Sequence, residues 1–230
     1  MRRMPILKIL WLALLVTSAV FTAGSFAPSV RADEDDPVKA ELEKAANAAA
    51  VAKAGDLLRN PQSPVIGNTK ADTTIVIFTD YQCPYCKAAE PRVLQLTKDD
   101  PGVKVVIKEF PILGPASVVA TKAALAAVKQ GKYEAFHNAL MAFRGTLTED
   151  VIFSTAKTVG LDVERLKKDM ITPEITDQII DNYNLARAMK ISVTPGYMVN
   201  SHVLSGVSAK TMTSQINFPR EVAAARAAGK

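Results

Sequence analysis

The sequence is poor in the residues that build metal sites and disulfide frameworks. Its 230 residues include two cysteines, two histidines and one tryptophan. A zinc site made only of Cys and His would need Cys83, Cys86, His137 and His202 together, with His137 lying 51 positions after Cys86 and His202 a further 65 positions on. No common structural zinc motif has that spacing. We therefore expect no metal site, and we expect both histidines to be ordinary surface or half-buried residues.

The sequence also lacks a net charge once its first 32 residues are set aside. The whole chain carries +5, but residues 1–32 hold four of its 28 basic residues and no acidic residue. The rest has 24 basic against 23 acidic residues, a difference of +1. Attraction to nucleic acid or to an anionic membrane has no electrostatic basis in such a chain. We expect no nucleic-acid partner.

The N-terminal residues have the layout of a secretory signal peptide. Three basic residues precede the apolar run Ile9–Phe21, and Val30-Arg31-Ala32 supplies small residues at the positions before a cleavage site. This predicts a signal peptide over residues 1–32, cleavage after Ala32, and export to the periplasm. The alternative is an uncleaved membrane anchor, because no charged residue occurs from Ile9 to Val30.

A leader rich in alanine and charge follows, over residues 33–60. Asp36-Pro37 and Asn60-Pro61 predict where one helix begins and ends. Apolar residues recur along it at alternating spacings of four and three, a short seam that could pair with a second subunit. We expect homo-oligomerisation through residues 37–59, or else a helix that is solvated or docked on its own subunit. The seam consists of Val38, Leu42, Ala45, Ala49 and Ala52.

The remaining pattern is that of an α/β protein with a helical insertion between the two halves of its sheet. A β-branched run predicts a buried strand. The segment Cys83–Lys98 is predicted to be a helix with Pro91 inside it, and residues 115–189 are predicted to form a block of helices. An aromatic stripe in that block is expected to be core. The predicted strands and final helix are Thr74–Phe78, Val103–Lys108, the hairpin Tyr197–Val199 and His202–Leu204 with its Asn200-Ser201 turn, and a helix beginning near Ser208; the stripe is Tyr133, Phe136, Leu140 and Phe143.

Cys83 and Cys86 are separated by two residues on the first turn of the predicted helix. A disulfide closing so short a loop removes little entropy from the unfolded chain, so reactivity is a better reason for it than stability. The outer thiol, Cys83, faces unpaired backbone N–H groups at the positive end of the helix dipole. We expect Cys83 to be the attacking thiolate, with a pKa lowered to about 6, and Cys86 to be the resolving thiol.

Three motifs make the chain resemble the DsbA family of thioredoxin-fold proteins, in family order over about residues 62–229. The resemblance implies a thioredoxin fold with an inserted helical domain and an extra N-terminal helix. Its core would be formed by residues 61–114 and 191–230 and the insertion by residues 115–190. The motifs are the stretches 65–68 and 74–87, which include Cys83-Pro84-Tyr85-Cys86, the stretch 108–114, and the stretch 193–200.

The resemblance further implies which residues surround the thiols. Pro84 and Tyr85 would form the active-site loop, and Pro195 would be cis beside it, with the backbone of Thr194 exposed to an extended substrate peptide. From Thr194-Pro195-Gly196 alone, an ordinary trans turn proline would be favoured. Exported polypeptides would be the substrates, a membrane or periplasmic protein the redox partner, and no metal or nucleotide cofactor would be needed.

Three functions remain open from the sequence. The first is an exported dithiol oxidase that exchanges disulfides with secreted polypeptides. The second is an oligomeric isomerase or reductase, because Thr194 and the Cys-Pro-Tyr-Cys centre resemble those branches, and because the leader is similar to that of the suppressor-of-copper-sensitivity C proteins. The third is a copper-binding or client-binding module.

One position departs from the family pattern. Many relatives have an acidic residue six positions before the first cysteine, where this chain has Ile77. Glu109 and Lys108 are candidates for the proton transfer that such an acid would carry out. Because side chains alternate along a strand, only one of the two is expected to point inward, and we favour Glu109.

Overall fold

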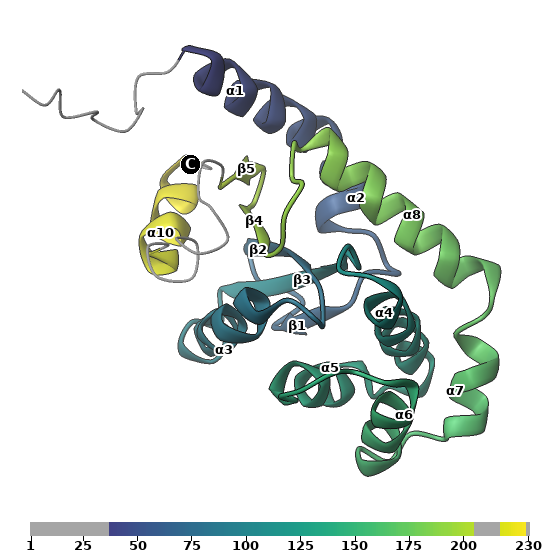
Figure 1. The fold of residues 1–230 in the computed structure, drawn as a ribbon. Helices are drawn as coiled ribbons and strands as arrows, with labels where there is room; N and C mark the ends of the chain where they lie inside the picture. Colours follow the sequence, from purple (N-terminus) through teal and green to yellow (C-terminus); the bar gives the residue numbers. More distant parts are fainter. Residues whose placement is uncertain (1–36, 205–216, 229–230) are drawn as a thin grey trace, which may run out of the picture. The chain divides into compact units, whose positions relative to one another are not determined.

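The computed structural model describes residues 37–204 and 217–228. The signal peptide predicted over residues 1–32 and the helix predicted near Ser208 lie outside these residues. Within them, no helix is long and apolar enough to cross a membrane. Figure 1 shows the elements in chain order.

The leader forms two helices and not the single helix that its sequence predicts. α1 (Pro37–Ala52) is followed by α2 (Ala54–Leu58), with Lys53 between them outside helical geometry, at φ −102° and ψ 13°. Gly55, one of the weakest helix formers, is the second residue after the break. The break lets Leu57 of α2 reach the core, where its side chain is fully buried.

A five-stranded sheet of order β1-β3-β2-β4-β5 lies at the centre of this part of the chain. β2 and β3 are parallel and joined by a helix, whereas the other pairs are antiparallel. Every residue of β2 is buried, which explains its continuous apolar, β-branched run. The strands are β1 (Val65–Gly67), β2 (Thr73–Thr79), β3 (Val103–Glu109), β4 (Gly196–Val199) and β5 (His202–Val203).

Helices cover both faces of the sheet. α3 (Pro84–Asp99) and α10 (Phe218–Ala228) pack on the face that carries Ile75 and Ile77. α1, α2 and α8 (Pro173–Ala188) pack on the opposite face, which carries Val76 and Phe78. The two apolar layers follow from strand alternation, since successive side chains of β2 point to opposite faces.

The helical block predicted between the two halves of the sheet is confirmed. Its helix starts follow the sequence signals: the Thr148 side chain accepts a hydrogen bond from the N–H of Val151, and Asp162 accepts one from Arg165. The stripe predicted as core is buried at its first three positions and half-buried at Phe143. The block consists of α4 (Pro115–Ala127), η1 (Val128–Gln130), α5 (Tyr133–Ala142), α6 (Glu149–Thr158), α7 (Val163–Asp169) and α8.

The final strands form the predicted hairpin. Asn200 has φ +50°, which suits the tight turn between β4 and β5, and its side chain accepts a hydrogen bond from the N–H of Thr74. This contact ties the hairpin to the start of β2, so the two halves of the sheet are held in register across 126 residues of chain.

Candidate active site

Cys83 lies after the end of β2 and is the N-cap residue of α3. Its Sγ accepts a hydrogen bond from the backbone N–H of Cys86 at 3.3 Å, in the position usually taken by a capping oxygen. Pro84 occupies the first helical position, where its missing N–H costs nothing. The local sequence thus places a sulfur atom at the positive end of a 16-residue helix.

The two thiols have opposite electrostatic surroundings. A side-chain hydrogen bond from Cys86 lowers the pKa of Cys83 to about 6, against the effect of burial, with further hydrogen bonds from Thr194 and from the N–H groups of Cys86 and Tyr85. Burial raises the pKa of Cys86 well above its usual value, and the hydrogen bond to Cys83 adds to this. Both cysteines are free thiols, 2% and 1% exposed. At neutral pH, Cys83 is therefore the thiolate and Cys86 the thiol.

The cis-proline loop closes the site from the other half of the chain. The Thr194-Pro195 peptide bond is cis, so the geometry expected from the family resemblance is present. The Cys83 thiol donates a hydrogen bond to the carbonyl oxygen of Thr194 at 3.3 Å, across 111 residues. Pro84, Tyr85 and Val193 are exposed around this contact, whereas Thr194 and Pro195 are buried.

Asp80 holds the turn between β2 and the thiols. Its carboxylate is fully buried and accepts three hydrogen bonds: from the N–H of Gln82 at 2.7 Å, the hydroxyl of Ser117 at 2.7 Å and the N–H of Leu113 at 2.9 Å. These bonds join the active-site turn to the connection between β3 and α4. No pattern in the sequence pointed to this role of Asp80.

A buried polar network lies behind the thiols. The hydroxyls of Tyr81 and Tyr133 donate to Oε1 of Glu109 at 2.6 and 2.7 Å, and both lie near Nδ1 of His137, at 2.7 and 3.2 Å. On its other side, His137 Nε2 is 2.5 Å from Oε1 of Glu90. These five side chains, all buried, are called the buried polar network below.

The expectation that His137 is a surface or half-buried residue is wrong. His137 is fully buried because its helix, α5, packs against α3 and α4, and a carboxylate lies on each side of its ring. Burial alone lowers the pKa of His137, but the charge of Glu90 and hydrogen bonds involving Glu109 and Glu90 raise it to about 10. A protonated His137 can then donate both N–H groups while the two tyrosines donate to Glu109. His202, by contrast, is exposed as expected.

Lys108 and Glu109 point to opposite faces of the sheet, as alternation requires, but both are fully buried. The expectation that only one points inward is wrong because both faces are covered. Glu109 lies on the face of the thiols. The ammonium group of Lys108 lies on the other face, donating to the carbonyl of Asp56 at 2.6 Å and the hydroxyl of Ser63 at 2.7 Å, so it does not serve the thiols.

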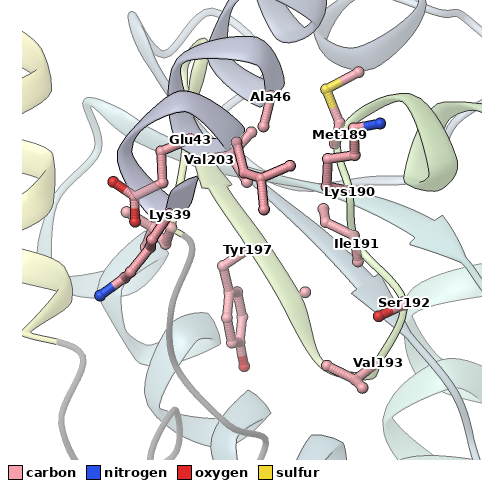
Figure 2. Close-up of a pocket in the computed structure, with 13 residues that line it drawn as sticks. Lys39, Glu43, Ala46, Met189, Lys190, Ile191, Ser192, Val193, Tyr197 and Val203 are labelled. Atoms are coloured by element: carbon pink, nitrogen blue, oxygen red, sulfur yellow. The ribbon is translucent and has the colours of Figure 1, made fainter. Parts of the chain in front are cut away.

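Two hollows flank the site. One, of about 220 Å³, lies between α1 and the loop that leads into Pro195, with Lys39 and Glu43 on one wall and Ile191 and Val193 on the other (Figure 2). The second, of about 430 Å³, lies between α3 and α5 and is called the α3–α5 cleft below. In the described part of the chain, no three His, Cys, Asp or Glu side chains are grouped so that they could hold a metal ion.

The hydrogen bonds to Cys83 predict its titration. Thiolate absorbance of the reduced protein should rise with a midpoint near pH 6, so that about nine-tenths of Cys83 is ionised at pH 7. Cys86→Ala removes the strongest of these hydrogen bonds and should move the midpoint to higher pH. A wild-type midpoint at pH 8 or above would contradict the assignment of Cys83 as the thiolate.

The charge on His137 predicts a pH-dependent stability. The pKa of His137 is raised to about 10 in the folded state against about 6.5 unfolded, so its contribution is complete below pH ~6.5 and is lost as pH rises toward 10. His137→Gln should lower the free energy of unfolding by about 3 kcal/mol near pH 6.5, and the difference from wild type should shrink toward pH 10. Urea unfolding of the reduced proteins between these pH values measures it. His202→Gln, at an exposed position, is the control; a difference independent of pH would contradict the prediction.

Comparison with known proteins identifies the relatives of this chain. The model of the DSBA-like thioredoxin domain family matches residues 74–216. Two solved structures cover most of it: a thioredoxin-like oxidoreductase from Silicibacter pomeroyi (41% identity, 72% of this chain and 96% of that one, TM-score 0.65) and the catalytic domain of Proteus mirabilis ScsC (28%, 77% and 98%, 0.66).

A curated relative is much longer than this chain. The Na(+)/H(+) antiporter NhaA 1 of Salinispora arenicola is 31% identical over 138 residues, which are 59% of this chain and 21% of that protein. The chain thus spans about a fifth of the length of the first curated relatives that it matches. The thioredoxin-type core with inserted helices, expected from the motifs, is confirmed by the family match and by the solved structures. The chain belongs to the family of DSBA-like thioredoxin domains.

Proposed function

We propose that this protein is an exported thiol:disulfide oxidoreductase that exchanges disulfides with secreted polypeptides through Cys83 and Cys86. The observation that carries the proposal is the opposite direction of the two pKa shifts on one helical turn. A thiolate that attacks and a neighbouring thiol that stays protonated until needed are the two parts that dithiol exchange requires.

In the reducing direction, the Cys83 thiolate attacks one sulfur of a substrate disulfide. A Cys83–substrate disulfide forms, and the other substrate sulfur leaves as a thiolate that takes up a proton. Cys86 then loses its proton and attacks Sγ of Cys83. The Cys83–Cys86 disulfide forms, the second substrate thiolate leaves, and two electrons have passed to the substrate. The oxidising direction is the reverse.

The surroundings of Thr194 support peptide binding at the same point. Its carbonyl accepts a hydrogen bond from Cys83 only while Cys83 is a protonated thiol, and this donor is absent once Cys83 is a thiolate or is bonded to a substrate sulfur. The carbonyl is then available to a backbone N–H of an extended substrate. Pro84 and Tyr85, the latter 38% exposed, offer apolar contact on the other side of the sulfur.

The lowered pKa of Cys83 favours the oxidising direction. A shift from 9.0 to about 6 stabilises the reduced form by about 1.4 kcal/mol at pH 7, which corresponds to ~30 mV toward a stronger oxidant. Export rests on the signal peptide proposed for residues 1–32, and a membrane or periplasmic protein would restore the redox state of the thiols after each exchange.

Single cysteine substitutions test the exchange reaction. Cys83→Ser should abolish both reduction of insulin and oxidation of a dithiol peptide, because no other thiolate is available. Cys86→Ser should also stop turnover but leave Cys83 joined to the substrate, which mass spectrometry detects as a mixed disulfide. Insulin reduction that persists in Cys83→Ser would overturn the proposal. A metal ion that co-purifies and depends on the thiols would favour the copper-binding alternative.

Assembly through α1 is a second proposal, favoured by the exposure of four of its five seam residues; the fifth, Ala49, is half-buried against the core of the same chain. Leu42 is 50% exposed, while Ala46 and Ala50 on the neighbouring face of the helix pack on the core of the same chain. We propose that an oligomer formed through this seam would act as a disulfide isomerase or reductase.

A pair of matched substitutions tests assembly. Leu42→Glu should lower the mass measured by light scattering to that of a monomer, and with it the refolding of a scrambled-disulfide substrate. Val51→Glu places the same charge on α1 away from the seam, where Val51 is 64% exposed, and should change neither quantity. A monomeric wild-type protein would show that assembly through α1 does not occur.

A further inference from the structure

The resolving thiol has to carry a negative charge inside the protein. Cys86 must become a thiolate before it can attack Sγ of Cys83. Its side chain is 1% exposed and lines neither the hollow beside α1 nor the α3–α5 cleft, so bulk water does not solvate the charge. A buried anion is stable only where hydrogen-bond donors surround it, and these donors must come from the protein.

We propose that the hydroxyl of Thr79 and the backbone N–H of Asp80 form a binding site for the Cys86 thiolate, called the thiolate site below. This inference rests on the proposed function of the thiols. The two donors belong to consecutive residues at the end of β2, and neither residue was brought forward from the sequence for a role in the reaction.

The side chain of Thr79 lies on the same face of the sheet as the thiols. Side chains alternate along β2, so Thr79 shares the face of Ile75 and Ile77, which α3 covers. Cys86 packs in the apolar layer of that face. Thr79 is paired with Glu109 in the register between β2 and β3, and Glu109 points to the same side. The β-branched side chain of Thr79 is restricted in rotation, which fixes the position of its hydroxyl.

The hydroxyl of Thr79 has no acceptor in the resting protein. Its Oγ1 is buried and has no hydrogen-bond partner among the described residues. The neighbouring carboxylate, Glu109, already accepts from Tyr81 and Tyr133 at Oε1 and from the hydroxyl of Thr121 at Oε2. Because an unpaired buried hydroxyl destabilises a fold, the presence of this one calls for a reason other than stability.

Both donors of the thiolate site act on Cys86. Burial, followed by the hydrogen bond and the charge of Cys83, raises the pKa of Cys86, whereas the N–H of Asp80 and the hydroxyl of Thr79 lower it. A donor lowers the pKa of a thiol because it stabilises the anion more than the neutral form. The hydrogen of a hydroxyl rotates about its C–O bond, so that of Thr79 is free to turn toward the sulfur once the charge appears.

The other hydrogen bonds of Asp80 hold the second donor in place. Its buried carboxylate accepts from the N–H of Gln82, the hydroxyl of Ser117 and the N–H of Leu113. Its backbone carbonyl accepts from the N–H of Cys83 at 3.1 Å. These four bonds fix the orientation of the peptide between Thr79 and Asp80, so its N–H stays directed at the thiolate site.

The resolving step is balanced without a further reactant. The S–H bond of Cys86 breaks, a bond forms between the sulfur atoms of Cys86 and Cys83, and the bond between Cys83 and the substrate sulfur breaks. The substrate sulfur leaves with the electron pair of the broken bond and takes up the proton. Thr79 keeps its own proton and donates a hydrogen bond to the sulfur while the charge is on Cys86.

Titration of Cys86 tests the thiolate site without any turnover. In Cys83→Ala, the group whose charge and hydrogen bond raise the pKa of Cys86 is absent, and NMR of isotope-labelled cysteine follows the remaining thiol alone. Adding Thr79→Val, which replaces the hydroxyl by a methyl group, should raise the midpoint by about one pH unit, the effect of one hydrogen bond to a charged group. Thr79→Ser keeps the hydroxyl and should restore the midpoint.

Other ionisable groups near Cys86 also influence this midpoint, but they are the same with and without Thr79→Val. They belong to the active-site turn, the buried polar network and β4. These groups are Asp80, Lys87, Glu90, Tyr81, Glu109, Tyr133, His137 and Tyr197.

Single-turnover kinetics test the same donors during the reaction. Reduced protein in excess over 5,5′-dithiobis(2-nitrobenzoate) should release thionitrobenzoate in two phases, first as Cys83 attacks the reagent and then as Cys86 attacks Cys83. Thr79→Val should leave the first phase within twofold of wild type. It should slow the second phase about threefold at pH 7, because a tenfold smaller thiolate fraction is partly offset by the greater nucleophilicity of a more basic thiolate.

Two controls separate the proposed role from general damage to the fold. Thr74→Val makes the same substitution at a buried position on the opposite face of β2, and should change neither the midpoint of Cys86 nor the second phase. Thr79→Val should also unfold at a higher urea concentration than wild type, because it removes an unpaired buried hydroxyl. A less stable Thr79→Val would show that the hydroxyl has a partner in the resting protein, against the proposal.

The two readouts distinguish the proposal from the function on which it rests. A Cys86 midpoint that Thr79→Val leaves unchanged would overturn the role of Thr79. The absence of thionitrobenzoate release from the wild-type protein would instead overturn the proposed function of the thiols. Thr79→Ala removes the same hydroxyl and takes the place of Thr79→Val if that variant does not fold.

Discussion

The close approach of Sγ of Cys83 to the carbonyl oxygen of Thr194 is the constraint on which the rest of the fold depends. Its two ends are 111 residues apart, one at the start of α3 and the other in the loop before β4. Bringing them within 3.3 Å requires β4 to lie beside β2 in the sheet, which in turn requires the helical block to leave from β3 and return on the far side. The register between β2 and β4, from Ile75 opposite Val199 to Phe78 opposite Gly196, delivers Thr194 to the sulfur.

Burial of charge is the second constraint. Two carboxylates and one imidazole lie in the interior beneath α3, where an isolated ion would cost several kcal/mol. Burial of these ions is possible because each one contacts a group of opposite charge or a hydroxyl. The positive charge of protonated His137 lies near the carboxylates of both Glu90 and Glu109. Removing His137 leaves Glu90 without its hydrogen-bond partner among the described residues and leaves Glu109 without its neighbouring cation. The network therefore links the rigidity of the site to its protonation.

Local patterns were enough to predict most elements of this fold. The apolar run of β2 and the turn at Asn200 are each determined by neighbours in sequence, and each was placed correctly. His137 could not be placed in this way, because its partners are 47 and 56 residues distant in the chain. Its environment depends on how α5 packs against α3, which no local pattern reveals.

The candidate site shows the same division. The positions of Cys83 and Cys86 followed from their spacing, whereas the cis geometry at Pro195 followed only from the family resemblance. Glu90 is four residues after Cys86, a spacing that was visible in the sequence, but a helix has several such pairs. Only the packing of α3 shows which face is buried. The break at Lys53 was missed for a similar reason, since it serves the docking of Leu57 on a sheet formed by later residues.

The ammonium group of Lys108 gives the leader a structural part that its sequence does not suggest. This cation is buried beneath the sheet, and burial lowers its pKa to about 8. The backbone carbonyl that accepts one of its hydrogen bonds belongs to Asp56 in α2. A chain shortened to begin at Pro61 would expose the apolar surface that Leu57 now covers. It would also remove one hydrogen-bond acceptor of the buried Lys108 ammonium group. α2 is thus an integral part of the domain. Shortening the protein at this point would measure the loss of stability on uncovering its core, and not the contribution of the contacts proposed between α1 and a second subunit.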